Sequence, residues 1–267
     1  MRPAVNVAIL WLLFAGMHIG LASRRIRNPL VERLGPLGFS MLFSAVAAVT
    51  FPPFMHYYAT VRFEGAAGLD VGRFAPLRYL GIGVITAGVT LIVSSLWRFP
   101  ASTLALVGPR RFEPRGMERI TRHPFFVGVA LMGLAHVALS THLVGTVAFG
   151  GLAFLTIAGA LHQDRKLLAN VGAPYADYLR QTSLVPFAAI ATGRQHIVWH
   201  ELPWRGLAVG LALAFALRSV HDSIMSHGGA WVIGVVLGGA ALATVQLLAH
   251  RRRQAVTDPG LARSAPK

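Results

Sequence analysis

Cysteine is absent from this 267-residue chain. Thiolate metal sites, disulfides, iron–sulfur clusters and cysteine nucleophiles are therefore all excluded. The sequence also lacks a His-Glu-x-x-His zinc motif, a glycine-rich phosphate loop and an ordered Ser–His–Asp set of the kind that hydrolases use. Eleven histidines remain as the side chains best suited to bind a transition metal or a cofactor iron.

Charged residues are scarce as well, at 13% of the chain, whereas a soluble protein has roughly a quarter. Apolar residues make up 54% and the mean hydropathy is +0.57. This composition predicts an integral membrane protein. The 25 Lys and Arg outnumber the 10 Asp and Glu, which gives a net charge of +15. In a membrane protein we expect these cations to mark cytoplasmic loops, and we expect no nucleic-acid partner.

Seven apolar stretches approach the length of about 17–25 residues that a helix needs to cross a bilayer. The predicted spans are approximately Pro3–Ala22, Pro36–Ala59, Leu77–Trp97, Pro124–Ser140, Leu143–Leu161, Gly206–Val220 and Ala230–Ala249. The fourth and fifth are separated only by Ser140, Thr141 and His142, so a tight helical hairpin is expected there. The sequence thus predicts an all-α, polytopic transmembrane helix bundle.

Arginine-rich loops follow the first, third, fifth and seventh spans. Because cytoplasmic loops are enriched in Lys and Arg, this alternation predicts an outside N-terminus and a cytoplasmic C-terminus. We expect a single transmembrane domain over residues 1–249 and a disordered, basic, cytoplasmic tail over 250–267. The expected location is a lipid bilayer, the bacterial inner membrane, with the chain crossing it several times.

Two histidines lie inside predicted spans, where an ionisable side chain is costly and indicates a functional site. They are His18 in the first span and His136 in the fourth. Each could simply form an interhelical hydrogen bond, but both have glycine neighbours that would let a flat ligand approach. Neutral imidazole is a good ligand for haem iron. One turn before His136, Met132 could be a thioether ligand or could fill space against a ring. The depths of the two histidines along their spans differ by roughly 12 Å at 1.5 Å per residue, so shared binding would require tilted or kinked helices.

Three arginines precede the fourth span at i, i+4 and i+7, namely Arg115, Arg119 and Arg122. On one helix they would share a face at the cytoplasmic interface. That face could meet lipid phosphates or clamp anionic groups of a bound cofactor, such as haem propionates. His123, which follows, is expected at the membrane surface and is a weaker ligand candidate.

Other histidines and acids lie near span ends. Asp164, beside His162 after the fifth span, could orient a histidine as a base or an iron ligand, or could belong to a solvated helix end. No role is assigned to the histidines grouped toward the outer face, which are His56, His142, His221 and His227.

Several segments together resemble the NnrU family and, within it, the zeta-carotene isomerase group. They are His18-Ile19-Gly20-Leu21-Ala22-Ser23, Gly116 to Pro124, Leu134-Ala135-His136, Asp164-Arg165-Lys166-Leu167, Thr182 to Ile190 and Gly193-Arg194-Gln195. The resemblance covers roughly residues 14–196, and the Thr182–Gln195 match is its most specific part.

The resemblance implies a multi-pass membrane protein that binds haem b, with His18 and His136 as iron ligands and catalytic residues. It implies a haem-dependent cis–trans isomerase acting on a hydrophobic polyene, with Arg119 and Arg122 near the propionates. Gly133 is a departure, because the isomerase group has a cysteine there that takes part in ligand exchange. Gly133 is counted with the cofactor-binding positions, together with Arg115, Met132 and Asp164.

Two alternatives stay open. NnrU proteins are associated with nitrite and nitric oxide metabolism (denitrification), so the chain could be a non-enzymatic haem or redox protein. Arg122-His123-Pro124 with Gly172, Tyr175 and Tyr178 also resembles the isoprenylcysteine and phospholipid methyltransferases, which use S-adenosylmethionine. Those enzymes have two acids where this chain has Gln163-Asp164.

Overall fold

The computed structural model describes residues 1–97, 112–239, 241 and 245. Within this part of the chain the regular elements are helices, and one isolated bridge pairs Ala67 with His142. The long helices are α1 (Arg2–Ala22), α2 (Arg24–Val61), α3 (Ala75–Trp97), α4 (Pro124–Leu139), α5 (Leu143–Val171) and α8 (Trp204–Ser219). Short helices are η1 (Val71–Arg73), η3 (Gly116–Arg119), α6 (Ala173–Gln181), α7 (Ala188–Ala191), η4 (Trp199–Glu201), α9 (His221–Ile224) and η5 (Ser226–Gly229). Residues 230–239 are helical again.

A helix occupies each of the first six predicted spans and the described part of the seventh. Four of them, α1, α2, α3 and α5, are long and apolar enough to cross a membrane, while α4 is a shorter apolar helix of 16 residues. The seventh predicted span is described only in part, and the predicted tail over 250–267 lies wholly outside the described residues. The all-helical membrane architecture is thus confirmed, whereas the count of seven crossings and the orientation of the termini stay predictions.

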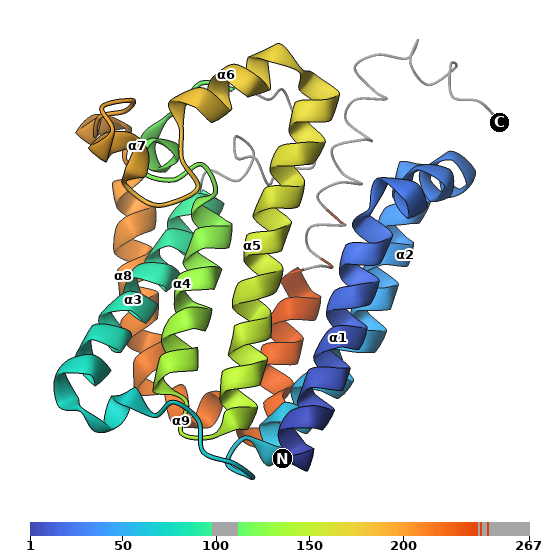
Figure 1. Ribbon diagram of the computed structural model, residues 1–267, viewed down its shortest axis with the longest axis vertical. Coiled ribbons are helices and arrows are strands. Elements are labelled where there is room, and N and C mark those ends of the chain that lie inside the picture. Colours follow the sequence, from blue (N-terminus) through green and yellow to red (C-terminus); the bar gives the residue numbers. More distant parts are fainter. Residues whose placement is uncertain (98–111, 240, 242–244, 246–267) are drawn as a thin grey trace.

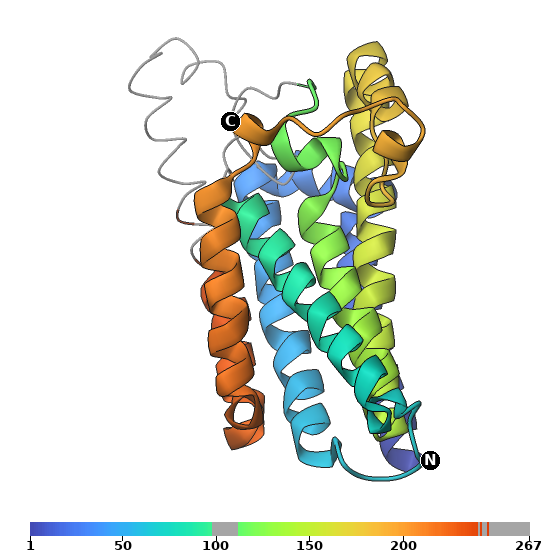
Figure 2. The same ribbon diagram turned by 90° about the vertical axis from the view of Figure 1, so that its left-hand side faces the viewer.

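The helices pack in a row in which α5 lies between α4 and α1. The chief contacts join α8 to α3, α3 to α4, α4 to α5, α5 to α1 and α1 to α2 (Figure 1). The turn between α1 and α2, together with η3, α6 and α7, lies at the end of the bundle away from the N-terminus (Figures 1 and 2). We call this the arginine-rich end, because Arg24, Arg25, Arg115, Arg119 and Arg122 are in its segments. The opposite end contains the α4–α5 turn and α9.

Glycines allow the close helix contacts. At the α3–α4 crossing, a Cβ on Gly88 would lie 2.6 Å from the Gly128 carbonyl oxygen, and a Cβ on Gly128 would lie 2.6 Å from that of Gly88. Larger side chains at either position would push the helices apart. Such small-residue contacts are typical of membrane helices, where close packing replaces the hydrophobic effect between helices.

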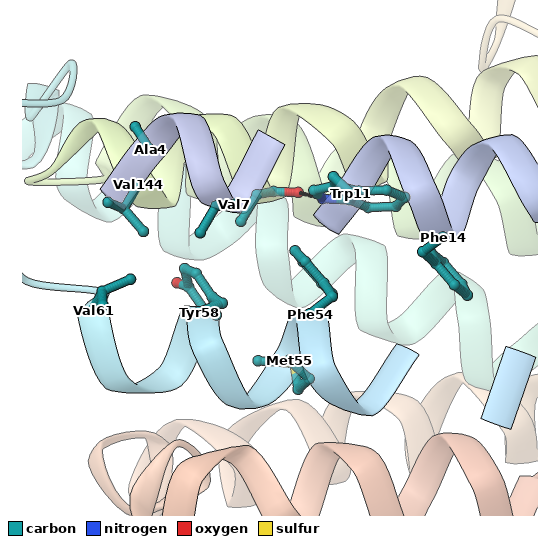
Figure 3. Packing of buried hydrophobic residues seen from close by; sticks show 10 residues of the cluster. Ala4, Val7, Trp11, Phe14, Phe54, Met55, Tyr58, Val61 and Val144 are labelled. Carbon is teal, nitrogen blue, oxygen red and sulfur yellow. Dashed lines mark hydrogen bonds between the residues drawn. The ribbon is translucent and has the colours of Figure 1, made fainter. Parts of the chain in front are cut away.

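An aromatic core joins α1, α2 and α5 (Figure 3). Trp11 lies at its centre, with ring centroids 5.5 Å from Phe14 and 5.2 Å from Phe54. Its indole N–H donates to the Ala148 carbonyl oxygen at 2.6 Å (Figure 3). This bond satisfies the one polar atom of the ring inside an apolar contact.

Two helix boundaries refine the prediction. Helix α2 is broken at Gly35, whose φ of 69° and ψ of 167° are not helical, so that its membrane segment starts at the predicted Pro36. Helix α5 continues to Val171, ten residues past the predicted end of the fifth span, because no glycine or proline interrupts it before Gly172. Asp164 therefore lies within a continuous helix. The predicted α4–α5 hairpin is confirmed, with Ser140 and His142 as the caps that flank its turn.

Candidate functional site

A buried polar cluster at the arginine-rich end centres on the carboxylate of Asp164, which is 7% exposed. The Arg122 guanidinium donates to its Oδ2 from Nε at 2.9 Å and from Nη2 at 2.7 Å. Its Oδ1 accepts from His123 Nε2 at 2.6 Å and from the Tyr175 hydroxyl at 2.6 Å. Three side chains from two other segments of the chain therefore meet at this carboxylate, and the buried charge is both paired and hydrogen-bonded.

The segment before α4 holds two of these side chains in position. The Thr121 hydroxyl donates to the Leu184 carbonyl oxygen at 2.8 Å, and the Arg122 backbone N–H donates to that of Ser183 at 2.9 Å. Pro124 then begins α4 in the first turn, where its missing N–H costs nothing. The stretch Thr182–Ile190 thus supplies the two carbonyl oxygens that fix Thr121 and Arg122.

Tyrosines form the wall of the cluster on the side of α6. Gly172 has a φ of 75° and turns the chain from α5 into α6. This turn stacks Tyr175 on Tyr178 with centroids 5.6 Å apart, and Phe112 packs edge-on against Tyr175. Burial raises the pKa of Tyr178 well above its ordinary value, so this phenol stays neutral.

A second ion pair links η3 to η4. Arg119 donates to Glu201 from Nε at 2.8 Å and from Nη2 at 3.1 Å, and it donates to Gln195 Oε1 at 2.8 Å. The Gly116 backbone N–H also donates to Glu201 at 2.9 Å. These bonds from Arg119 and Gly116 lower the pKa of Glu201 to about 2, and the same pairing raises the pKa of Arg119.

The prediction that Arg115, Arg119 and Arg122 share one helix face is wrong. Gly116 has a φ of 55°, and η3 is a single 3-10 turn that ends at Arg119, so the helical spacing never applies. Each guanidinium pairs with a different carboxylate, and Arg115 reaches exposed Glu113 at 2.9 Å. Their role as a clamp for cofactor anions stays a prediction.

His136 lies near the opposite end, three residues before α4 ends. Its Nδ1–H donates to the Met132 carbonyl oxygen at 2.8 Å, so that the lone pair of the neutral ring is on Nε2. The imidazole packs on Phe149 of α5, with centroids 4.4 Å apart, and its centroid is 6.2 Å from that of His221. Met132 therefore contacts His136 through its backbone carbonyl. The missing side chain of Gly133 lets α5 approach, since a Cβ there would lie 3.1 Å from the Phe149 carbonyl oxygen.

His18 occupies different surroundings on α1. Its ring centroid lies 5.3 Å from that of Phe14 and 4.4 Å from that of Phe43. A Cβ on either Gly16 or Gly20 would meet no atom of the described chain within 4 Å, so there is room beside this turn of α1.

The structure does not bring His18 and His136 together. Counted from the arginine-rich end, His18 is four residues from the end of α1 and His136 is twelve residues from the start of α4. At 1.5 Å per residue their depths differ by roughly 12 Å, and α5 packs between the two helices.

The hydrogen bonds from His123 and Tyr175 to Asp164 were not predicted from the sequence. His123 was expected at the membrane surface, but it is 1% exposed and bonded to Asp164. Asp164 was expected either to orient a histidine or to be solvated. It does bind a histidine, but that residue is His123 rather than the neighbouring His162. The sequence signal that could have indicated this cluster is Asp164 itself. A carboxylate that becomes buried needs a cation or a hydrogen-bond donor as its partner.

Comparison with known proteins places the chain in a family. The family model described as "NnrU protein" matches residues 7–252. The 15-cis-zeta-carotene isomerase of Arabidopsis thaliana, a chloroplastic protein, is 30% identical over 199 residues, which cover 72% of this chain and 52% of that protein. The Zea mays isomerase is 27% identical over 199 residues with the same coverage. The chain thus spans about half the length of these relatives, and no solved structure matches it. A family match over nearly the whole helical bundle shows that the chain belongs to the NnrU family.

Proposed function

We propose that this protein is a membrane isomerase that converts a cis double bond of a linear, apolar polyene to trans, with haem b as its cofactor. The observation that carries the proposal is the 30% identity over 199 residues with a 15-cis-zeta-carotene isomerase. An apolar polyene dissolves in the bilayer, so a helix bundle of this composition can receive it from the lipid phase.

His136 is the residue that best fits an iron ligand. Its Nδ1–H is fixed by the Met132 carbonyl, and its Nε2 has no hydrogen-bond partner in the described part of the chain. Metal-binding histidines characteristically use one ring nitrogen for such an orienting bond and the other for the metal. Phe149 holds the plane of the ring. When bound, haem iron supplies a Lewis-acidic position that can act on a substrate without polar groups.

His18 is the second ligand implied by the resemblance. Gly16 and Gly20 leave room beside it for a flat group, but its depth differs from that of His136 by roughly 12 Å. Joint binding of one iron by these two rings would require α1 to shift along α5. The charged groups Arg119, Arg122 and Asp164 bind protein partners and thereby hold the helices in place, and their binding of cofactor anions stays a prediction.

An absorption spectrum of the detergent-purified, haem-supplied protein tests the cofactor. We expect a b-type Soret band that is lost in His136→Ala and kept in the control His196→Ala, whose histidine is exposed outside the helices. A wild-type protein without haem absorption under these conditions would contradict the proposal.

Liposomes containing protein and 15-cis-zeta-carotene test the activity, with chromatography of the isomers as the readout. We expect conversion by the reduced wild type and none by His136→Ala. Haem binding without conversion would favour the non-enzymatic redox alternative of nitrogen-oxide metabolism. Saturable S-adenosylmethionine binding by haem-free protein would favour the methyltransferase alternative.

A further inference from the structure

We infer that residues 24–34 form a helix that lies flat in the membrane surface and binds the headgroups of anionic phospholipids. We call this segment the surface helix. It lies at the arginine-rich end, where α1 turns into α2 (Figure 1). Neither the haem nor the polyene of the proposed function enters the inference, so the two can fail separately.

Two backbone breaks separate the surface helix from its neighbours. Ser23 has an extended backbone, with a φ of −63° and a ψ of 142°, and ends α1. The Arg27 backbone N–H then donates to the Ser23 carbonyl oxygen at 2.8 Å, so the new helix starts immediately. Gly35, with a φ of 69°, ends it before the membrane segment of α2. The surface helix can therefore leave the direction of the long helices, and it lies across them at their end (Figure 2).

One face of the surface helix is apolar and largely uncovered. Ile26, Leu30 and Leu34 follow one another at i, i+4 and i+8, which places them on the same face of a helix. Ile26 is 45% exposed and Leu34 is 49% exposed. Water is an unfavourable surrounding for such a face. Acyl chains below the headgroups of a bilayer would cover it.

The other faces of the surface helix carry positive charge. Four arginines and one glutamate give the segment a net charge of +3. Arg24, Arg25 and Arg33 are exposed, and none of them forms an ion pair with a carboxylate in the described residues. Arg27 packs over the ring of Phe39, 5.4 Å from its centroid, and so links the surface helix to the membrane segment of α2. Three guanidinium groups therefore remain available for phosphate oxygens.

An anionic lipid surface fits both faces at once. Helices that lie in the plane of a membrane combine an apolar face with Lys or Arg on the polar face. Each Lys or Arg near an anionic membrane strengthens binding by roughly fivefold. Arg119 and Arg122, at the same end of the bundle, already bind Glu201 and Asp164. The surface helix thus has the charges that the protein itself leaves for a lipid.

Nitroxide labels test the position of the surface helix in full-length protein, in liposomes of phosphatidylglycerol and phosphatidylcholine. The chain has no cysteine, so each introduced cysteine is the single site of labelling. Labels on Ile26→Cys and Leu34→Cys should collide at least twofold more often with oxygen, which dissolves in lipid, than with a water-soluble nickel chelate. The matched controls Asn28→Cys and Glu32→Cys lie on the opposite face and should show the reverse preference.

Two outcomes of this measurement would contradict the inference. Equal access of the nickel chelate to all four labels would mean that the surface helix stands in water. Labels at residues 26 and 34 that are shielded from both reagents would mean that protein, such as a second copy of the chain, covers the apolar face. Either result would leave the proposed isomerase untouched.

Lipid selectivity tests the role of the charges. Spin-labelled phosphatidylglycerol should associate with the wild type in preference to phosphatidylcholine, and the double variant Arg24→Gln, Arg25→Gln should lose at least half of this preference. The matched control Arg73→Gln, Arg78→Gln removes the same charge at the opposite end, also from exposed positions, and should keep it. Equal losses in the two variants, or no preference in the wild type, would overturn the lipid site.

Discussion

The two ends of the bundle differ in how their polar side chains are paired, although His123 Nδ1 at the arginine-rich end is, like His136 Nε2, without a hydrogen-bond partner in the described residues. At the arginine-rich end, Arg122, His123 and Tyr175 all bind Asp164, and Arg119 binds Glu201 through two bonds. At the other end, His136 and His221 each keep one ring nitrogen free of protein partners in the described chain.

This difference separates a structural role from a chemical one. A carboxylate with four donor contacts has little capacity left for a ligand, but it fixes three segments relative to one another. An imidazole with one free lone pair remains available to a metal. The number of charged residues in a region is therefore a poor guide to its chemistry, and the ring nitrogens without partners, His136 Nε2 and the buried His123 Nδ1, are to be weighed beside it.

Removing the carboxylate from the arginine-rich end should have the largest effect on stability. Asp164→Ala leaves the Arg122 charge and His123 buried without their acceptor, and we expect a loss of about 3–5 kcal/mol of unfolding free energy. Denaturant unfolding in detergent micelles measures this loss. The matched control is Asp177→Ala, which breaks an exposed pair with Arg180 and should cost less than about 0.5 kcal/mol. Equal losses in the two variants would contradict the structural role of the cluster.

Acid should weaken the Arg119–Glu201 pair next. The pKa of Glu201 is about 2 in the folded protein and 4.5 in the reference state. Its stabilisation is therefore complete above pH 4.5 and is lost as the pH falls toward 2. Because water screens this partly exposed pair, we expect an effect of about 1 kcal/mol. Unfolding curves measured over this pH range should lose that component in Glu201→Gln, and an identical pH dependence in both proteins would show that the pair contributes nothing.

Changes at the other end should affect stability least. His221 is half exposed, so in cofactor-free protein His221→Ala should change the unfolding free energy by less than about 0.5 kcal/mol. His136→Ala should abolish the absorption of the proposed haem, whereas Glu201→Gln should leave that absorption unaltered. Thermal unfolding and absorption spectra of the three variants provide the comparison. It would fail if His221→Ala destabilised the cofactor-free protein as strongly as Asp164→Ala.

Much of the helical layout could be predicted from the sequence, because long apolar runs and the short Ser140–His142 break determine where helices begin and end. The pairing of Asp164 could not, since Arg122 and His123 are 42 and 41 residues away in the chain. The i, i+4, i+7 spacing of Arg115, Arg119 and Arg122 predicted a shared helix face. That prediction was wrong because the positive φ of Gly116 is incompatible with a continuous helix there. The proximity of His221 to His136 depends on how α8 and α9 return past α4, and local sequence carries no signal for that.

The length of helix α5 can be compared with the thickness of a bilayer. Its 29 residues extend for about 43 Å, and Asp164 lies about 32 Å from its start at 1.5 Å per residue. The hydrocarbon core of a typical bilayer is about 30 Å thick. If α5 crosses it without tilt, starting at one face, the carboxylate would stand at the boundary between acyl chains and headgroups. A thicker membrane would then draw the Asp164 cluster into hydrocarbon, and a thinner one would expose it to water, so that lipid chain length would change how strongly these charges attract one another.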